Sequence, residues 1–408
     1  MQKKLDTKKN AKTSSKNELK NLKRLSLNEG SPKEGGLGSR RGLFKKAIGV
    51  TAAVPILGYP MFSIAKSPVV LKMQGAWGSK DIFNEYAQEY VDRVNQMAKG
   101  RLRIDFLYAG AVVKPFEITD AVSKGVLDAG HQVPVYWYGK SKVASLFGSG
   151  PINGANSEQM LGWIMRGGGY ELYERLLKKL NLNIKGFFSF PMPTQPLGWF
   201  KKTPPKEKNQ LKGIKYRTVG LAADLMQELG MKVTQLPGGE IIPAMERGVL
   251  DAFEYNNPTS DRRLGAQDVC KNYLLGSFHQ AMEFFEILFN KTKYDALSDD
   301  LKAILRYAAE AASASNTWTA QKNYSKDLQA LIIKDKVRVS RTPKEIFAAQ
   351  LEAWDKVTAR LEKEDPFFKE VHESQKTWAK KVAYFSFFNE ADFKMGYEHT
   401  FKVKLPKD

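Results

Sequence analysis

Residues 117–129 of the chain read EITDAVSKGVLDA, and residues 240–252 read EIIPAMERGVLDA. The two stretches share Glu, Ile, Ala, a basic residue and the closing Gly-Val-Leu-Asp-Ala. A short helix that ends at glycine and leads into a strand explains this spacing, because glycine accepts the left-handed conformation found at many helix ends. Chance likeness between two helix-to-strand corners is the alternative interpretation. Two copies favour a chain built from two similar α/β lobes.

The residues before each copy follow one pattern. Residues 69–77 and 102–107 are apolar runs typical of strands, and residues 80–99 carry apolar side chains at helical spacing before Gly100. The second copy is preceded by predicted strands at residues 213–218 and 232–236 and a predicted helix at residues 221–229. This alternation predicts a parallel sheet in each lobe.

The last third of the chain predicts long helices. Residues 298–336 are rich in Ala, Leu, Lys and Gln, and residues 343–363 and 366–385 continue in the same way. Helices of this length either brace two lobes across their joint or cap a single lobe, and the pattern alone leaves both interpretations open.

The N-terminal residues predict an export signal. Residues 1–38 are polar and free of aromatic residues, and Arg40-Arg41 precede an apolar run at residues 47–62 that is short for a membrane span. The paired arginines resemble a twin-arginine signal, with a chance pair before a signal anchor as the alternative. We therefore expect a periplasmic protein.

The charge of the chain does not indicate a nucleic-acid partner. The formal net charge is +20, but residues 1–66 alone hold 15 Lys/Arg against 4 Asp/Glu, so more than half of the excess lies in the predicted signal. No nucleic-acid-binding motif is recognisable in the rest. Cys270 is the only cysteine, which excludes an internal disulfide and a multi-cysteine zinc site.

Few residues suggest catalysis, whereas several suggest binding. The four histidines lack zinc-ligand spacing, and neither a nucleophile elbow nor a phosphate-binding glycine loop is visible. Arg217 ends a predicted strand, where ligands of open α/β sheets bind, and an arginine there can hold a carboxylate through two parallel hydrogen bonds. An ordinary surface arginine is the alternative.

Aromatic and amide side chains follow both copies of the repeat. Trp137 and Tyr138 follow the first copy, and Phe253 and Asn257 follow the second. If the lobes face each other, these corners line the cleft between them, and their composition suits a small, mostly apolar site. Core packing is the alternative for Trp137 and Phe253.

Five stretches, the last of them inside the second copy of the repeat, carry a family resemblance. They are YWYGK at residues 136–140, QPLGWF at 195–200, LKGIKYR at 211–217, LPGGEI at 236–241 and AMERGVLDA at 244–252. On them the chain resembles, from about residue 69 to 390, the DctP-type solute receptors of tripartite ATP-independent periplasmic (TRAP) transporters. It is most similar to those for 2-oxo acids and related monocarboxylates.

The resemblance implies an α/β, two-lobed periplasmic-binding-protein fold with a long helix bridging both lobes. We expect an export signal in residues 1–66, one lobe in residues 67–190 with part of the C-terminal region, a second lobe in residues 191–295, and bridging and capping helices in residues 296–408.

The resemblance also implies a carboxylate anchor and a cation. By analogy Arg217 pairs with the substrate carboxylate, and Na⁺ or Ca²⁺ bridges protein and ligand through oxygen atoms of Gln195, Glu254 and Tyr255. Gln280 stands near the last ligand position, where relatives commonly have Glu. If it replaces that Glu, one negative charge is missing and Na⁺ or no ion is favoured.

Binding and transport are therefore the expected function. We expect a receptor, not an enzyme, that captures a small organic acid and delivers it to TRAP membrane subunits, as a monomer or a homodimer. An exported enzyme acting on a small carboxylic acid and a sensory binding subunit are the alternatives.

Overall fold

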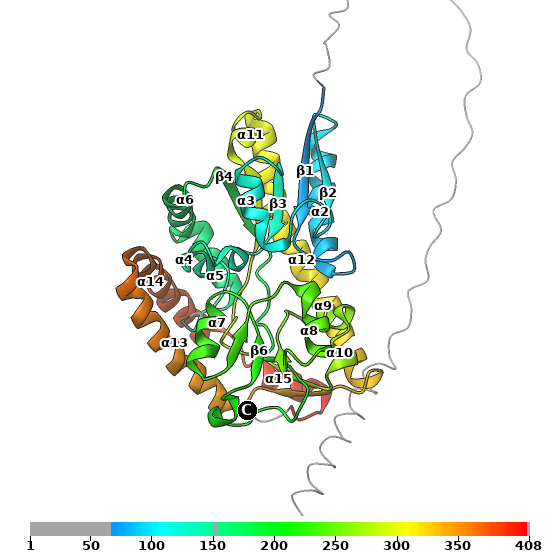
Figure 1. The fold of residues 1–408 in the computed structure, drawn as a ribbon, viewed down its shortest axis with the longest axis vertical. Helices are drawn as coiled ribbons and strands as arrows, with labels where there is room; N and C mark the ends of the chain where they lie inside the picture. Colours follow the sequence, from blue (N-terminus) through cyan, green and yellow to red (C-terminus); the bar gives the residue numbers. More distant parts are fainter. Residues whose placement is uncertain (1–66, 151–152, 406–408) are drawn as a thin grey trace, which may run out of the picture. The chain divides into compact units, whose positions relative to one another are not determined.

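The computed structural model describes residues 67–150 and 153–405, and the predicted export signal lies outside these residues (Figure 1). Within the described part, no helix is long and apolar enough to span a bilayer. Residues 68–408 form one compact unit. Two sheets organise it, each the centre of a lobe.

The first sheet has five strands in the order β2-β1-β3-β10-β4. Its strands are β1 (Val69–Gly75), β2 (Leu102–Leu107), β3 (Ala129–Gln132), β4 (Ile184–Ser189) and β10 (Phe285–Asn290). β1 pairs in parallel with β2 and β3, whereas β10 runs antiparallel between β3 and β4. The helices of this lobe are α2 (Ile82–Ala98), α3 (Ile118–Ser123), α4 (Val143–Leu146), α5 (Ser157–Arg166), α6 (Gly169–Lys179) and α11 (Lys291–Asp295).

Helix α2 shows how the local sequence sets an element. Its N-cap is Asp81, whose Oδ1 accepts a hydrogen bond from the Phe83 amide at 3.0 Å. Its C-cap Lys99 adopts the left-handed conformation, and Gly100 follows with a positive φ. Between the caps, apolar residues at helical spacing bury one face, as the periodicity predicts.

The second sheet has six strands in the order β11-β9-β5-β8-β6-β7. Its strands are β5 (Gly198–Phe200), β6 (Lys215–Arg217), β7 (Lys232–Thr234), β8 (Ala252–Phe253), β9 (Asn272–Leu275) and β11 (Arg338–Arg341). The helices of this lobe are α7 (Leu221–Glu228), α8 (Ile241–Glu246), α9 (Pro258–Leu264) and α10 (Ala266–Val269). Short 3-10 turns occupy Pro115–Glu117, Pro134–Trp137, Lys208–Leu211 and Gly238–Glu240.

The two sheets repeat one plan, which confirms the interpretation of the sequence repeat. The strand order of the first sheet is β2-β1-β3-β10-β4. The equivalent strands of the second sheet, in the same order, are β7-β6-β8-β5-β9, and β11 is an additional strand at the edge beside β9. The two copies of the repeat occupy equivalent places, one as α3 and β3 and the other as α8 and β8. In both sheets the fourth strand runs antiparallel to the third.

Two segments cross between the lobes side by side. Residues 190–197 lead from β4 to β5, and residues 276–284 lead from β9 back to β10. The Met192 amide donates to the Glu283 carbonyl at 2.9 Å, and the Gln195 amide donates to the Gln280 carbonyl at 3.1 Å. The second lobe was expected to extend to residue 295. In the structure β10 pairs with β3 and β4, so this strand belongs to the first sheet.

The C-terminal helices span the joint. They are α12 (Asp299–Ile333), α13 (Lys344–Glu364), α14 (Pro366–Asn389) and α15 (Phe393–Phe401). Helix α12 has 35 residues, about 52 Å at 1.5 Å per residue, and packs on α2 and β4 of the first lobe and on α9 of the second (Figure 1). The predicted bridging helix is therefore confirmed, and a cap on one lobe is excluded.

Candidate ligand-binding cleft

Arg217 ends β6 and lies inside the joint between the lobes, with 1% of its side chain exposed. Its Nε donates to the Leu236 carbonyl at 2.9 Å. Its Nη1 donates to the Glu254 carbonyl at 2.9 Å and to Glu254 Oε1 at 2.8 Å. These bonds fix the plane of the guanidinium, and a planar fork held in this way can bind a carboxylate.

The guanidinium borders a small interlobe cavity of about 10 Å³, which is room for about one water-sized sphere. The residues that line it are Trp77, Phe83, Val133, Tyr136, Arg217, Val219, Tyr255, Asn256, Gln280 and Glu283. Among these, Arg217 is the one cation. Burial lowers the pKa of the nearby His131 and His279 to about 3, so both rings are neutral and the positive charge comes from Arg217.

Two carboxyl groups and an amide accompany Arg217. Gln195 Nε2 and Asn256 Nδ2 donate to Glu283 Oε2 at 2.7 and 2.8 Å. Gln195 Oε1 and Glu254 Oε2 are buried and make no hydrogen bond within the described residues. Burial raises the pKa of Glu254 to about 7 and that of Glu283 well above its usual range, although the charge of Arg217 opposes both shifts.

These oxygen atoms fit a hard cation. Carboxylate and amide oxygens are the ligands that Na⁺ and Ca²⁺ prefer, and a buried oxygen without a donor gains most from a cation. The described residues contain no cluster of three or more His, Cys, Asp or Glu side chains suited to a metal. A cation here would therefore depend on the amide oxygen of Gln195 beside the two carboxylates.

Two aspartates join the lobes around the cavity. Asp81, at the start of α2, accepts hydrogen bonds from the Tyr255 hydroxyl at 2.5 Å and the Ser260 hydroxyl at 2.8 Å. Asp224, on α7, accepts from the Tyr138 hydroxyl at 2.5 Å and pairs with Lys142 at 2.6 Å. Each aspartate thus meets two side chains of the opposite lobe, so the described conformation is closed.

Some predicted site residues come together at the cavity. Arg217, Tyr255 and Gln280 line it, with the Arg217 Cζ 6.0 Å from the centre of the Tyr255 ring. Gln195 and Glu254 lie behind this wall, where they bond to Glu283 and Arg217 respectively.

Besides Gln195 and Glu254, four predicted site residues are not among the lining residues, and each of the four has a structural partner. Trp137 is buried in the first lobe and donates to Glu286 at 2.9 Å, and Phe253 stacks on Trp199 in the second sheet. Asn257 is the N-cap of α9, and Tyr138 bonds to Asp224 across the joint. Core packing, the alternative for Trp137 and Phe253, therefore describes their surroundings.

A buried carboxyl group, that of Glu283, lies three positions beyond Gln280. The Gln280 amide lies 3.4 Å from the Val219 carbonyl oxygen and 3.5 Å from Thr218 Oγ1, so it borders the turn after β6. Glu283 faces Gln195 instead. The site therefore carries two buried carboxyl groups, those of Glu254 and Glu283, and burial raises the pKa of both.

Most of the apolar wall of the cavity was not predicted from the sequence. Trp77, Phe83 and Val133 belong to the first lobe, and Tyr136 lies beside Trp137 in a stretch quoted for its resemblance. Trp77 is the last residue of the first predicted strand. Ligands of open α/β sheets bind beyond the carboxyl ends of the strands, so a place for Trp77 in the site could have been predicted. Phe83 reads as an ordinary residue of an amphipathic helix and gives no such signal.

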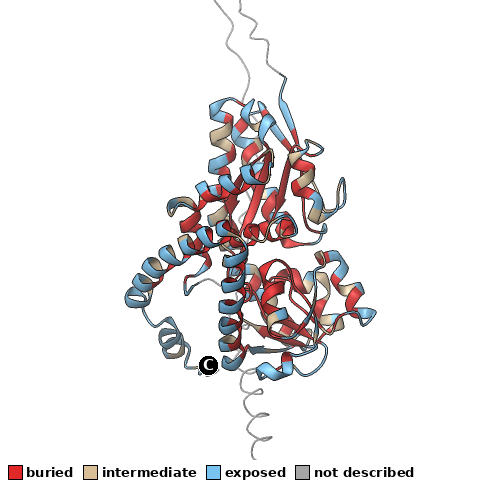
Figure 2. Ribbon diagram, turned by 60° about the vertical axis from the view of Figure 1, so that its left-hand side comes forward, coloured by how far each residue is buried: buried red, intermediate tan, exposed pale blue. Residues whose placement is uncertain are grey.

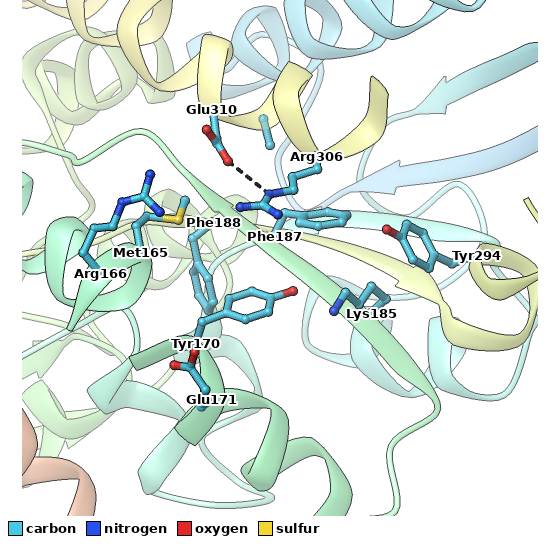
Figure 3. Close-up of a pocket in the computed structure, with 11 residues that line it drawn as sticks. Met165, Arg166, Tyr170, Glu171, Lys185, Phe187, Phe188, Tyr294, Arg306 and Glu310 are labelled. Atoms are coloured by element: carbon cyan, nitrogen blue, oxygen red, sulfur yellow. Dashed lines mark hydrogen bonds and ion pairs between the residues drawn. The ribbon is translucent and has the colours of Figure 1, made fainter. Parts of the chain in front are cut away.

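A larger hollow, of about 400 Å³, lies on the first lobe away from the joint (Figure 3). Two of its charged side chains are already paired, Arg306 with Glu310 at 3.2 Å and Lys185 with Glu174 at 2.5 Å. Figure 3 shows the Tyr170 and Tyr294 rings among the side chains that line it. We place the binding site in the smaller cavity, because buried polar groups converge there.

The sequence model of the DctP family, described as bacterial extracellular solute-binding protein, family 7, matches residues 73–365. The chain belongs to this family. Periplasmic receptors of this kind are exported, in agreement with the expected location. The monocarboxylate 2-oxoacid-binding periplasmic protein of Nostoc sp. is 29% identical over 307 residues, which cover 75% of this chain and 83% of that protein.

Solved structures of TRAP solute-binding proteins share the fold. A TRAP transporter solute-binding protein from Bordetella bronchiseptica, a dimer with calcium and picolinate in one site and the other site apo, has a TM-score of 0.77 and 26% identity. The matched region covers 83% of this chain and 98% of the Bordetella chain. A relative from Pseudoalteromonas atlantica, with bound sodium and pyruvate, has a TM-score of 0.75 and 26% identity, and covers 82% and 99%.

Proposed function

We propose that this DctP-family protein is an extracytoplasmic receptor that captures a small 2-oxo acid or related monocarboxylate between its lobes. The observation that carries the proposal is Arg217, a single buried cation held in a fixed plane beside an apolar cavity. Its bonds to Leu236 and Glu254 use Nε and Nη1, so a ligand carboxylate would meet the Nη2 amino group.

The cavity wall limits the rest of the ligand. Trp77, Phe83 and Val133 offer apolar contacts and no second cation. A dicarboxylate would bury a second negative charge without a partner, which costs several kcal/mol or more. A short acid with one carboxylate matches the charge and polarity of this wall. The pyruvate bound by the Pseudoalteromonas relative is of that class.

A cation bound by Gln195, Glu254 and Glu283 would complete the site. When bound, it would neutralise the two carboxyl groups and leave Arg217 free to attract the ligand carboxylate. The backbone carbonyl of Tyr255, the residue after Glu254, is the further oxygen ligand that the family resemblance implies. Sodium in the Pseudoalteromonas relative and calcium in the Bordetella relative support this assignment.

The closed lobes suit delivery to membrane subunits of a TRAP transporter. Asp81 and Asp224 hold the lobes together, so the closed form is the one that would be presented to those subunits. We assign binding without turnover, since DctP relatives are named as binding proteins. We further propose export by the twin-arginine route, on the strength of Arg40-Arg41 in the signal.

Calorimetry with pyruvate, 2-oxobutyrate and succinate tests the proposal in chelated buffer and after Na⁺ or Ca²⁺ is restored. We expect the two oxo acids to bind and succinate to fail. Arg217→Lys should weaken pyruvate binding by roughly 100-fold, because lysine cannot reproduce the fixed planar fork. Circular dichroism of the variant checks its fold. Equal binding by Arg217→Lys, or a preference for succinate, would overturn the assignment.

A further inference from the structure

The second sheet carries a hollow at its outer edge. The hollow has a volume of about 430 Å³ and lies between the residues that follow β5 and the first three residues of β11. We call it the β11 hollow, because β11 is the edge strand of this sheet. Figure 2 shows the inner strands of the second lobe as buried and its outer side as exposed.

The directions of the strands place the β11 hollow at the opposite end of the sheet from Arg217. Arg217 is the last residue of β6, which runs parallel to β8. β5 runs antiparallel to β8, so Lys201, which follows β5, lies at the other end. Arg338 begins β11, which is parallel to β9 and therefore antiparallel to β5, so it lies at that same end. The β11 hollow is thus separate from the ligand cleft.

The residues that line the β11 hollow include three cations and no acidic residue. The cations are Lys201, Lys202 and Arg338, and none of them forms an ion pair within the described part of the chain. Lys201 Nζ donates to the Met245 carbonyl. Cations gathered in a hollow repel one another and attract anions from solvent, because the low-dielectric walls concentrate their field. A bound anion would remove this repulsion.

A buried amide fixes the position of Arg338. Asn272 is 5% exposed and lies opposite Arg338 in the pairing of β9 with β11. Its Oδ1 accepts a hydrogen bond from Arg338 Nε at 2.9 Å. Its Nδ2 donates to the carbonyls of Phe200 and Lys202 at 3.1 and 2.8 Å, so one amide holds both sides of the hollow. The Nη1 and Nη2 groups of Arg338 remain for a ligand, and a fixed guanidinium can bind two oxygen atoms in parallel.

We propose that the β11 hollow is a second ligand site and that it binds a phosphate monoester. A phosphate monoester carries a charge of about −1.5 to −2 and presents three acceptor oxygens. Two of these oxygens can bond to the guanidinium of Arg338, and the third can reach the ammonium group of Lys202. A carboxylate has two oxygens and a single charge, so it would leave part of this set unused.

The other lining residues agree with this ligand class. The hydroxyls of Thr203 and Ser340 make no hydrogen bond within the described residues, so both can donate to a phosphate oxygen. Val339 and Pro204 offer apolar contacts to the carbon atoms next to the ester oxygen. The same headgroup occurs free in solution, as in glycerol 3-phosphate, and on a membrane, as in phosphatidic acid. The inference goes beyond the proposed function and does not depend on it.

Calorimetry with glycerol 3-phosphate tests the proposal for a free ligand. We expect a Kd on the order of 1 mM or tighter, and succinate should bind at least about tenfold more weakly. Arg338→Gln and Lys202→Gln should each weaken binding at least about tenfold, because each removes a charged donor. Arg338→Lys keeps the charge and loses the planar fork, so it should also weaken binding, by about threefold or more.

Lys178→Gln is the matched control, because it removes an exposed lysine on α6 of the first lobe and changes the net charge equally. It should bind glycerol 3-phosphate as wild type does. Pyruvate binding should be unchanged in all four variants, since the β11 hollow lies at the far end of the sheet, and this measurement also checks that each variant is folded.

Cosedimentation with vesicles identifies the source of the phosphate group. Binding to vesicles that contain phosphatidic acid, absent with pure phosphatidylcholine and lost in Arg338→Gln, would assign the headgroup of a lipid. Binding of glycerol 3-phosphate without vesicle binding would assign a free ester.

Several results would overturn the proposal. They are a wild type that binds neither glycerol 3-phosphate nor phosphatidic acid, equal affinity for succinate, and an equal loss in Lys178→Gln. Full binding by both Arg338→Gln and Lys202→Gln would also overturn it. Failure of pyruvate to bind wild type would contradict the proposed function alone, because the phosphate titrations contain no pyruvate.

Discussion

The hydroxyl of Tyr255 donates a 2.5 Å hydrogen bond to Oδ2 of Asp81, and the two residues belong to opposite lobes. Tyr255 also forms part of the wall beside Arg217. One side chain therefore contacts both the ligand cavity and the joint that closes over it.

Tyr255→Phe should weaken pyruvate binding about tenfold, mostly through faster dissociation. The change removes a hydrogen bond to a carboxylate, which is worth about 1.5–3 kcal/mol, and this loss falls on the closed form. Calorimetry and stopped-flow fluorescence measure the two effects.

Tyr170→Phe is the matched control, because its hydroxyl donates to the Gly186 carbonyl at 2.8 Å within the first lobe. The control should bind as wild type does. If both variants lose the same affinity for pyruvate, the hydrogen bond between Tyr255 and Asp81 does not stabilise the closed form.

Glu283→Gln should abolish most of the cation dependence of ligand binding. The variant removes a carboxylate beside Gln195, so the gain in pyruvate affinity on adding calcium should fall by at least about tenfold. The comparison is made by calorimetry with and without chelator.

Gln280→Met serves as its control, since the Gln280 amide faces Thr218 and Val219. The calcium gain should persist in this variant even if overall affinity drops. A calcium gain that disappears in Gln280→Met and persists in Glu283→Gln would restore position 280 as the cation ligand.

Asp261 should make the folded state less stable as the pH rises. Burial raises the pKa of its carboxyl from 3.8 to about 6, against hydrogen bonds from Trp199 and Tyr273. Between those values the folded state binds more protons than the unfolded state. Its contribution is therefore complete below about pH 4 and is lost as the pH passes about 6.

Urea unfolding of wild type and Asp261→Asn from pH 4 to 7 measures this contribution. The stability difference between the two proteins should change by roughly 1–3 kcal/mol across the range. Asp295→Asn, which removes an exposed carboxylate on α11, should give parallel curves. Parallel curves for Asp261→Asn as well would contradict the assignment.

Gly198→Ala should destabilise the protein by about 3 kcal/mol or more. Gly198 begins β5 with a φ of +120°, and an added Cβ would lie 2.1 Å from the carbonyl oxygen of Phe253. Gly239→Ala is the control, because nothing lies within 4 Å of its Cβ position. Thermal unfolding should separate the two variants clearly, and similar midpoints would mean that β5 can shift.

The sequence predicted elements best where periodicity was strong and local. Residues 102–107 form β2 as predicted, and residues 221–229 contain α7 within one residue. The place of β10 was not predictable, because its sequence is mostly apolar and its neighbours, β3 and β4, are chosen by the tertiary fold. Such a run fits either lobe equally well.

At the site, too, residues with a local sequence signal were predictable and residues placed by the tertiary fold were not. Arg217 was predictable because it ends a strand at the edge where ligands of α/β lobes bind. Glu283 was not, since its direction depends on the pairing of its crossing segment with Met192. Trp137 gave a misleading signal, because a tryptophan beyond a strand can serve a cleft or a core, and here Glu286 holds it in the core.

The position of β10 between β3 and β4 also bears on how the chain is made. Synthesis begins with the strands of the first lobe, yet that sheet has a gap until residue 290 has left the ribosome. Both lobes therefore mature late and nearly together, once most of the chain has been translated. Neither lobe can be produced alone by cutting the gene at a single point, and a nascent chain that stops before residue 285 leaves the edges of β3 and β4 open to unwanted partners.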